Sequence, residues 1–450
     1  MTTGRLEYWV RQKLLSPVVR ASAPVLHVLA FVWRRLLFRT TFIAVTGSLG
    51  KTTAKECLAT ILASCGPAFR SYRNQNIAGA IAINLLRVRP WHRFAVLEVG
   101  ATAAGAMSRP ARLLRPDVAI LLNVLRTHTT SFQSLEEHAA EKRKLLDALT
   151  PGGLAVLNAD DPLLRPMADR ISNRVVLFGT AEDCDYRAER VSARWPQRLA
   201  FSVRHGPTVQ AVETQLVGAH WLPSVLAALA TAHALGVGLQ PAAEALRGAE
   251  PFPGRMQPVR VPNGAIVLRD DYNASIDTIE ASLRVLEEAS APRRLLVITD
   301  MSDLGKNRKQ RLKYLARRSP RAADVLVLMG EIAEYGRSRA IEAGMEPACA
   351  HAFPSIRDAA EFLRLELKPG DLMLLKGRTT DHAARIFLAQ LGPVGCWKDN
   401  CAKRMLCDIC WELEITPDQL RKATPVPAPA SSRDISLQAL GSPAPRIPLR

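Results

Sequence analysis

Between residues 42 and 245, short apolar runs alternate with longer segments whose apolar residues lie three or four positions apart. The short runs occupy residues 42–45, 94–99, 118–122, 154–157 and 175–178. Runs of this length predict buried strands, and the spacing between them predicts helices. Strands that alternate with helices favour a parallel α/β sheet. Residues 183–217 have shorter alternating runs and predict an antiparallel portion of the same domain.

A second unit follows a Pro-containing boundary near residues 250–254. Residues 222–235 predict a helix that leads to this boundary, and the alternation restarts near residue 265, with strands expected at 295–299, 325–329 and 372–375. We therefore expect a domain at 41–250 and another at 251–392. A basic amphipathic helix is expected at 1–40, a Cys-rich segment at 393–415, and a disordered tail, rich in Pro, Ala and Ser, at 416–450.

The first expected strand runs directly into the sequence TGSLGKTT at residues 46–53, and a helical pattern follows. Glycines allow backbone N–H groups to face a phosphate, the helix N-terminus adds positive potential, and a Lys and a Thr can contact phosphate and Mg²⁺. The strict eight-residue P-loop spacing fails, because Val45 occupies its first Gly position. The alternative is an ordinary turn. The candidate nucleotide ligands are Gly47, Ser48, Gly50, Lys51, Thr52 and Thr53.

Further short motifs occur along the chain in a fixed order. They are NQN at 74–76 with Gly79, LEVGA at 97–101, Asn123 with His128, SLE at 134–136 with Lys142, LNADD at 157–161, GR at 254–255, DDYNA at 270–274, DMSDLG at 300–305 and LKGR at 375–378. Together with the phosphate loop, this order resembles the Mur ligases, which join a carboxylate to an amine with ATP. The pieces at 270–274 and 300–305 are most similar to the branch that adds D-alanyl-D-alanine to a muramoyl tripeptide.

The resemblance implies a central P-loop ATPase domain followed by a C-terminal Rossmann-like domain, with ATP and Mg²⁺ as cofactors. It implies that ATP converts a carboxylate into an acyl phosphate, which an amine then attacks. Lys51 would contact ATP phosphates, Thr52 or Thr53 one Mg²⁺, and Glu98 and His128 would be metal ligands. Lys142 matches a lysine that many family members carbamoylate. Three residues match positions that reach ATP from the second domain: Arg255, Asp270 and Asn273.

The sequence also allows ordinary structural roles for these residues. Glu98 would be a surface carboxylate, His128 a loop histidine, and Lys142 an exposed helical lysine beside Glu141. Residues 218–224 read GAHWLPS and lack two Asn residues that the family usually has there. Trp221 would then either stack on a purine or pack in the core.

The segment before the phosphate loop also departs from the family pattern. Muramoyl-peptide ligases place a UDP-sugar domain there, whereas only about 40 residues precede the loop in this sequence. We expect an amide ligase whose carboxylate is a small molecule, or is bound to a carrier, and need not contain UDP. The alternatives are a peptidoglycan precursor ligase and a non-catalytic scaffold with the same fold.

The net charge of +18 and the pI near 10.0 call for an explanation. Basic residues in the first 41 positions are mixed with aromatic and aliphatic residues, which is typical of a helix on an anionic membrane surface. The alternative is a helix docked on the enzyme, with solvated Arg side chains. Charged residues interrupt 14–38, so no membrane span is expected. No nucleic-acid-binding module accompanies the charge, and we expect a cytoplasmic protein, with membrane association left open.

The eight cysteines fall into two groups. Cys57, Cys65, Cys184 and Cys349 are scattered and fit reduced thiols in a cytoplasmic protein. The other four follow the spacing C-x4-C-x5-C-x2-C, which fits one structural Zn²⁺. Reduced unliganded thiols and a disulfide are the alternatives. These four are Cys396, Cys401, Cys407 and Cys410.

Overall fold

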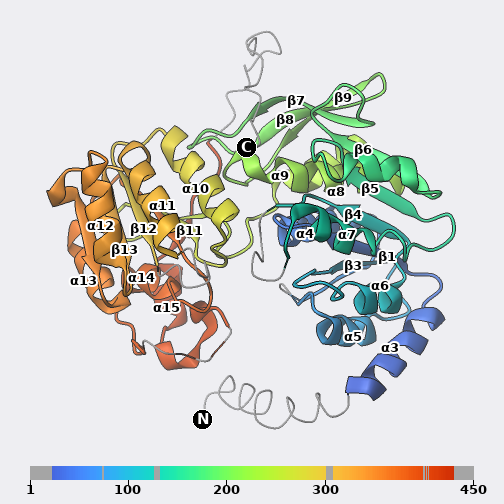
Figure 1. The fold of residues 1–450 in the computed structure, drawn as a ribbon, viewed down its shortest axis with the longest axis horizontal. Helices are drawn as coiled ribbons and strands as arrows, with labels where there is room; N and C mark the ends of the chain where they lie inside the picture. The colour runs from blue at the N-terminus through green and yellow to red at the C-terminus, as the bar shows by residue number, and fades with distance from the viewer. Residues whose placement is uncertain are drawn as a thin grey trace.

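The structure is a computed structural model, and it describes residues 23–72, 75–125, 132–299, 308–398, 401, 403 and 405–429. Two α/β units lie side by side (Figure 1). The first contains a nine-stranded sheet in the order β2-β3-β1-β4-β5-β6-β7-β8-β9. Its strands are β1 (Thr41–Thr46), β2 (Ala68–Arg70), β3 (Phe94–Glu98), β4 (Val118–Leu121), β5 (Leu154–Asn158), β6 (Arg174–Gly179), β7 (Tyr186–Ser192), β8 (Ala200–His205) and β9 (Thr208–Glu213).

Strand pairing in the first unit confirms the expected topology. Strands β2 to β7 pair in parallel, while β7, β8 and β9 pair antiparallel. The helices are α3 (Ala23–Leu36), α4 (Lys51–Ala63), α5 (Ala78–Arg87), α6 (Ser108–Leu114), α7 (Leu135–Arg143), α8 (Leu222–Ala234) and α9 (Leu239–Arg247), with 3-10 turns at Arg165–Arg170 and Ala219–Trp221.

The continuous apolar run of β1 is explained by burial on both faces of the sheet. Ile43 and Val45 pack in one core with α4 and α8, whereas Phe42 and Ala44 pack in another core with α5 and α6. Because successive side chains of a strand point to opposite faces, a strand covered on both sides must be apolar at every position. This double covering fixes the end of β1, where the phosphate loop begins.

The second unit contains a seven-stranded sheet in the order β14-β13-β12-β15-β11-β10-β16. Its strands are β10 (Gln257–Arg260), β11 (Ile266–Asp270), β12 (Arg294–Ile298), β13 (Val325–Met329), β14 (Ala350–Phe353), β15 (Leu372–Lys376) and β16 (Thr424–Pro425). The helices are α10 (Ile276–Glu288), α11 (Arg308–Ala322), α12 (Ala333–Glu342), α13 (Ile356–Glu366), α14 (Ala384–Ala389) and α15 (Pro417–Arg421), with 3-10 turns at Pro347–Cys349, Cys407–Ile409 and Trp411–Leu413.

The expectation of disorder from residue 416 onward is wrong for residues 416–429. Thr416 and Gln419 form a reciprocal capping box that starts α15, and β16 pairs antiparallel with β10 at the edge of the second sheet. Arg198 of the first unit donates to the carbonyl oxygen of Val426 at 2.6 Å. Composition predicted disorder, but local capping and strand pairing satisfy the backbone of this short segment.

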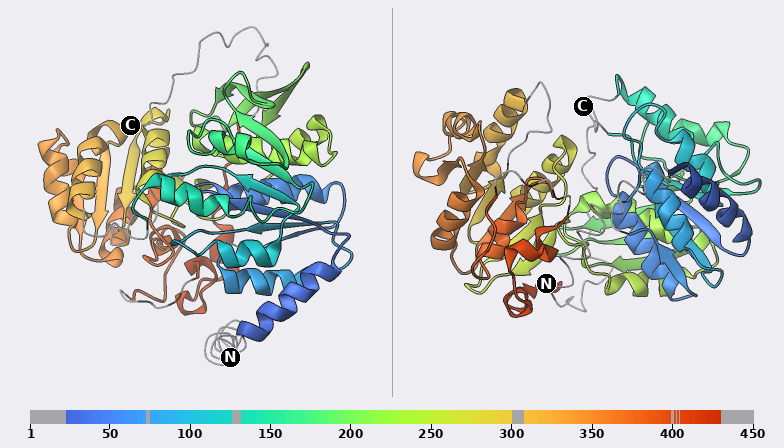
Figure 2. Two further views of the ribbon diagram at one scale, coloured as in Figure 1. Left: turned by 45° about the vertical axis from the view of Figure 1, so that its right-hand side comes forward. Right: turned by 90° about the horizontal axis from the view of Figure 1, so that it is seen from below.

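The Cys-rich segment is not an independent module. Cys396, Cys407, Cys410 and Leu413 are buried in the same core as α14 and β15 of the second unit. At the other end of the chain, α3 lies at the periphery of the first unit, beside α5 (Figures 1 and 2). None of the helices in the described residues is long and apolar enough to cross a membrane.

Candidate active site

The phosphate loop is held by side chains from two other elements. Asn123, which follows β4, accepts hydrogen bonds from the backbone N–H groups of Ser48 and Leu49 at 2.9 and 2.8 Å. The Ser224 hydroxyl donates to the carbonyl oxygen of Gly50 at 3.1 Å. Gly50 precedes α4 with φ 85°, and a Cβ there would collide with Ser224 Oγ. Only glycine fits this position without strain.

Lys51 is the first residue of α4, and its side chain turns back toward the loop. Its ammonium group donates to the carbonyl oxygens of Gly47 and Ser48 at 2.7 and 3.3 Å. Burial lowers the pKa of Lys51, while the nearby carboxylate of Glu98 opposes that shift. The cation therefore lies within the loop, beside the N-terminus of a helix, which is the geometry that binds phosphate.

Glu98 is a buried carboxylate at the end of β3, so the surface alternative is wrong. It is 2% exposed. Thr52 Oγ1 donates to Glu98 Oε2 at 2.9 Å, and Asn76 Nδ2 donates to Oε1 at 2.8 Å. A carboxylate and a hydroxyl beside a phosphate loop are oxygen donors of the kind Mg²⁺ prefers. Thr53 is also buried in the first turn of α4.

His128, expected as a second metal ligand, lies outside the described residues, as do Asn74 and the motif at 300–305. In the described ranges, no group of three or more His, Cys, Asp or Glu side chains is arranged to hold a metal ion. Beside the loop, Glu98 and Thr52 supply oxygen atoms that suit a metal ion.

Lys142 on α7 is 1% exposed, so the alternative of an exposed helical lysine is wrong. Its Nζ lies 2.5 Å from His138 Nε2. Burial lowers the pKa of Lys142 well below its usual value, and the charge of Lys51 lowers it further, although Asp161 and Glu141 act in the opposite direction. An amine in such surroundings favours its neutral, nucleophilic form.

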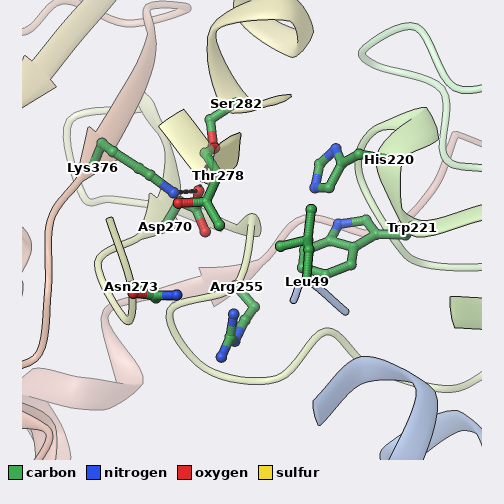
Figure 3. A pocket seen from close by; sticks show the side chains of 9 residues that line it. All are labelled: Leu49, His220, Trp221, Arg255, Asp270, Asn273, Thr278, Ser282 and Lys376. Carbon is green, nitrogen blue, oxygen red and sulfur yellow. Dashed lines mark hydrogen bonds and ion pairs between the residues drawn. The ribbon is translucent and has the colours of Figure 1, made fainter. Parts of the chain in front are cut away.

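A pocket between the two units gathers the three residues expected to reach ATP (Figure 3). Arg255, Asp270 and Asn273 come from the second unit, while Leu49, His220 and Trp221 come from the first. Asp270 ends β11 and accepts hydrogen bonds from Lys376 Nζ and from Ser282 Oγ. Two α/β units thus contribute polar side chains to one concave site, a common place for ligands.

Lys376, Ser282 and Thr278 also line this pocket, and sequence reasoning did not assign them to the site. Lys376 is 1% exposed at the end of β15, directly opposite Asp270 in the parallel register. Burial lowers the pKa of Lys376, and the Asp270 carboxylate opposes the shift. In the sequence, the only sign of this role is that Lys376 ends an apolar run. Its partner Asp270 becomes evident only from the pairing of β15 with β11.

Trp221 and His220 are the aromatic residues that line the pocket. Trp221 is 2% exposed and belongs to the core, as the packing alternative stated, yet its ring also borders the pocket. The ring centroids of His220 and Trp221 are 4.4 Å apart. Burial lowers the pKa of His220 to about 4, so the imidazole is neutral at physiological pH.

The four clustered cysteines line one small cavity together with His382. His382 Nδ1 lies 3.3 Å from Cys407 Sγ. All eight cysteines are free, so the disulfide alternative is not what the structure contains. Burial raises the pKa of Cys407 to about 12. Within the described residues, these side chains are not arranged as a metal-holding group.

Two family models match the chain. The Mur ligase middle domain matches residues 45–232, and the Mur ligase glutamate ligase domain matches residues 254–379. These ranges contain the phosphate loop, Glu98 and Lys142 in the first unit, and Arg255, Asp270 and Lys376 in the second. The two matches therefore cover both sides of the pocket.

Individual relatives agree with the family models. The UDP-N-acetylmuramoyl-tripeptide–D-alanyl-D-alanine ligase of Mycobacterium tuberculosis is 30% identical over 356 residues, covering 75% of this chain and 70% of the relative. The ligase of that name from Escherichia coli is 30% identical over 304 residues, covering 67% of this chain. The chain spans 62% of the length of that E. coli relative and 60% of the length of the Buchnera aphidicola one.

Solved structures show the same fold. MurF from Acinetobacter baumannii superposes with a TM-score of 0.72 at 26% identity, covering 80% of this chain and 79% of that one. A MurF ligase from Thermotoga maritima, in complex with ADP, superposes with a TM-score of 0.70 at 24% identity, covering 82% and 83%. The arrangement of the two units is thus shared with known ligase structures.

Proposed function

This chain belongs to the Mur ligase family, and we propose that it is an ATP-dependent amide ligase. The observation that carries the proposal is the shared pocket. The first unit contributes the phosphate loop, with the buried Glu98 and Lys142 in the same unit, and the second unit contributes Arg255, Lys376 and Asp270. A scaffold has no physical need for these buried charges, because each one costs desolvation energy.

Amide formation begins with activation of a carboxylate, because a carboxylate is a poor electrophile. In the proposed reaction a carboxylate oxygen attacks the γ-phosphorus of ATP, ADP leaves, and an acyl phosphate forms. Lys51 and the backbone N–H groups of the loop bind the phosphates and offset their negative charge. Glu98 and Thr52 would hold Mg²⁺, which neutralises phosphate charge when bound. The amine then attacks the acyl carbon, phosphate leaves, and the amine nitrogen loses a proton.

Lys142 has a supporting role in this proposal. A neutral lysine amine can attack CO₂, forming an N–C bond and releasing one proton, and the product is a carbamate with two oxygen donors. The lowered pKa of Lys142 favours the reactive neutral form, and His138 Nε2 lies at hydrogen-bond distance from the amine. Intact-mass measurement under CO₂, with Lys142→Arg as the control, tests this step. Activity that does not respond to removal of bicarbonate would contradict it.

The second unit would close the site over the nucleotide. Arg255 Nε has no hydrogen-bond partner within the described residues, and its guanidinium lies 4.7 Å from the centroid of the Tyr272 ring. A buried cationic donor that borders a pocket is suited to an anionic ligand. Asn273 offers amide donors beside it. We propose that both side chains contact ATP from the second unit when the two units close.

The carboxylate substrate is the next part of the proposal. We propose a small or carrier-bound carboxylate without UDP, because the two family models that match are those of the middle domain and the glutamate ligase domain, at residues 45–232 and 254–379. The similarity to ligases named for UDP-N-acetylmuramoyl-tripeptide favours that substrate as a second candidate. Phosphate release, measured with amino acids, dipeptides and UDP-muramoyl tripeptide, separates the two. Micromolar binding of the UDP substrate with D-alanyl-D-alanine-dependent ADP formation would overturn the first.

Two further elements complete the proposal. We propose one structural Zn²⁺ at the four clustered cysteines, because their spacing suits one ion and they line one cavity. The thiols would have to move toward the ion to ligate it, since they are not arranged as a metal-holding group in the described residues. Elemental analysis of protein purified without chelator should then give about one equivalent, lost on joint replacement of Cys407 and Cys410, and metal-free protein would contradict it. We also propose a cytoplasmic enzyme, where ATP is available, with its N-terminal segment in contact with a membrane.

A further inference from the structure

Helix α3 is apolar on two opposite sides, and the described residues cover only one of them. On the inner side, Ala30 and Leu37 are buried, and Trp33 Nε1 donates to the carbonyl oxygen of Val88 at 2.9 Å. On the outer side, five aliphatic residues recur at helical spacing and are 49–62% exposed: Val25, Val28, Leu29, Val32 and Leu36. A helix that is hydrophobic all round is normally buried on every side.

Within the described residues, α3 has 14 residues, whereas a helix that spans a membrane needs about 20. These five side chains also follow one side of the helix and are not isolated apolar residues scattered over the surface. Contiguous exposed apolar patches of this kind mark binding surfaces in soluble proteins. An amphipathic segment that lies flat in a membrane interface has this character.

A second exposed apolar group lies in the loop after α5, the helix that packs against α3. Trp91, in the loop after α5, is 68% exposed. This loop is tied to the helix region by the Trp33 bond to Val88 and by Thr40 Oγ1, which donates to the carbonyl oxygen of His92 at 2.7 Å. Tryptophan favours the boundary between water and lipid, because its ring is apolar and its N–H is polar.

Charge identifies the partner. The sequence contains no Asp or Glu between Glu7 and Glu56, and the loop of residues 87–93 adds three Arg residues and no acid. Arg34 is engaged with Asp117 at 3.3 Å, but Arg35 and Arg39 flank the exposed side without an acidic neighbour on the helix. An apolar stripe bordered by cations matches an anionic lipid surface. Two copies joined through this side would bring basic residues together, which disfavours a dimer.

We propose that the outer side of α3 and the Trp91 loop dock on an anionic lipid bilayer, with α3 lying parallel to the membrane plane. The aliphatic side chains enter the interface, and Arg35 and Arg39 contact lipid phosphates. This inference deepens the membrane contact in the proposed function, and it does not depend on ligase activity. A binding assay can therefore fail or succeed independently of the catalytic proposal.

The test is co-sedimentation of the full chain with vesicles of phosphatidylcholine alone, or of phosphatidylcholine with 30% phosphatidylglycerol. Strong binding is expected only to the anionic vesicles, and it should weaken as salt rises. The double variant Val28→Glu/Val32→Glu should lose binding at least tenfold while keeping the wild-type unfolding temperature, because both side chains are already exposed. Arg35→Gln should weaken binding about fivefold, and Trp91→Ala should also weaken it.

The matched control is Leu365→Glu, because Leu365 is 84% exposed on α13 of the second unit. It adds the same type of charge at an exposed leucine and should leave vesicle binding unchanged. Equal binding of wild type and the double variant would overturn the proposal. So would a wild-type dimer that ignores vesicles and becomes monomeric in the double variant, because the stripe would then be an interface between copies.

Discussion

The change Asp408→Ala should destabilise the second unit, because Asp408 completes a buried charge cluster. Asp408 belongs to the Cys-rich segment and forms an ion pair with Arg269 on β11. Arg269 also donates to Asp271 Oδ2 at 3.0 Å. Burial alone would lower the pKa of Arg269, but the carboxylates of Asp271 and Asp408 raise it. Without Asp408, Asp271 would be the remaining carboxylate beside Arg269. The guanidinium N–H groups that donate to Asp408 would lose their acceptor.

The magnitude follows from burial. Breaking a fully buried ion pair costs about 3–5 kcal/mol. The Asp408 side chain is 19% exposed, and Arg269 retains Asp271, so about 2–3 kcal/mol is expected for Asp408→Ala. Asp408→Asn keeps one hydrogen-bond acceptor and should cost about 1–2 kcal/mol. Urea unfolding of the full chain measures the loss in unfolding free energy for both variants.

The chain offers a matched control on the neighbouring helix α15. Asp418 pairs with Arg421 on α15, and its side chain is 81% exposed. Exposed pairs of this kind contribute roughly 0–1 kcal/mol, so Asp418→Ala should leave stability nearly unchanged. If Asp408→Ala and Asp418→Ala cost the same within about 0.5 kcal/mol, the reasoning about the buried cluster is refuted.

The same change should affect nucleotide binding, because Asp271 directly follows Asp270 in the pocket. Asp271 lies close to Gly254, and a Cβ on that glycine would be 3.4 Å from Asp271 Oδ1. Loosening Asp271 should displace the neighbouring Arg255. We expect Asp408→Asn to raise KM for ATP severalfold with a smaller effect on kcat. A change in kcat alone would indicate a role other than positioning.

Three further predictions concern the first unit and the pocket. Lys51→Ala should lower ATP turnover at least a hundredfold without changing the unfolding temperature, and near-normal phosphate release would remove the phosphate-loop assignment. Glu98→Ala should lose activity that high Mg²⁺ partly restores, and an unchanged Mg²⁺ dependence would exclude metal ligation. The pKa of His220 is about 4 in the fold and about 6.5 when unfolded, so the unfolded state binds more protons between these values. Stability should therefore fall by up to about 3 kcal/mol as pH drops from 6.5 to 4, and His220→Gln should flatten that dependence in urea titrations.

Much of the fold was predictable because β strands covered on both faces must be apolar throughout. The strand expected at 325–329 coincides with β13, and the one at 42–45 lies inside β1. The phosphate loop was predictable for a similar reason, since its backbone requires glycine at Gly50. Local constraints of this kind are written in consecutive residues.

The remaining features depend on contacts between distant residues. Helix α7 is polar in sequence, so nothing local indicates that Lys142 is buried against His138. Lys376 joins the pocket only because β15 pairs with β11 in the register that places it opposite Asp270. The order of α15 depends on a capping box that composition conceals. Burial and register are tertiary properties, and a single sequence leaves them undetermined.

The central claim is that this pocket activates a carboxylate with ATP. The most direct measurement uses an acid that supports phosphate release, prepared with ¹⁸O in its carboxylate group. Acyl phosphate formation transfers one carboxylate oxygen to the departing phosphate, so mass spectrometry should find inorganic phosphate carrying one ¹⁸O, together with an amide product. Lys51→Ala should release none. Phosphate without ¹⁸O, formed at the wild-type rate, would show that water rather than a carboxylate attacks ATP and would contradict the account.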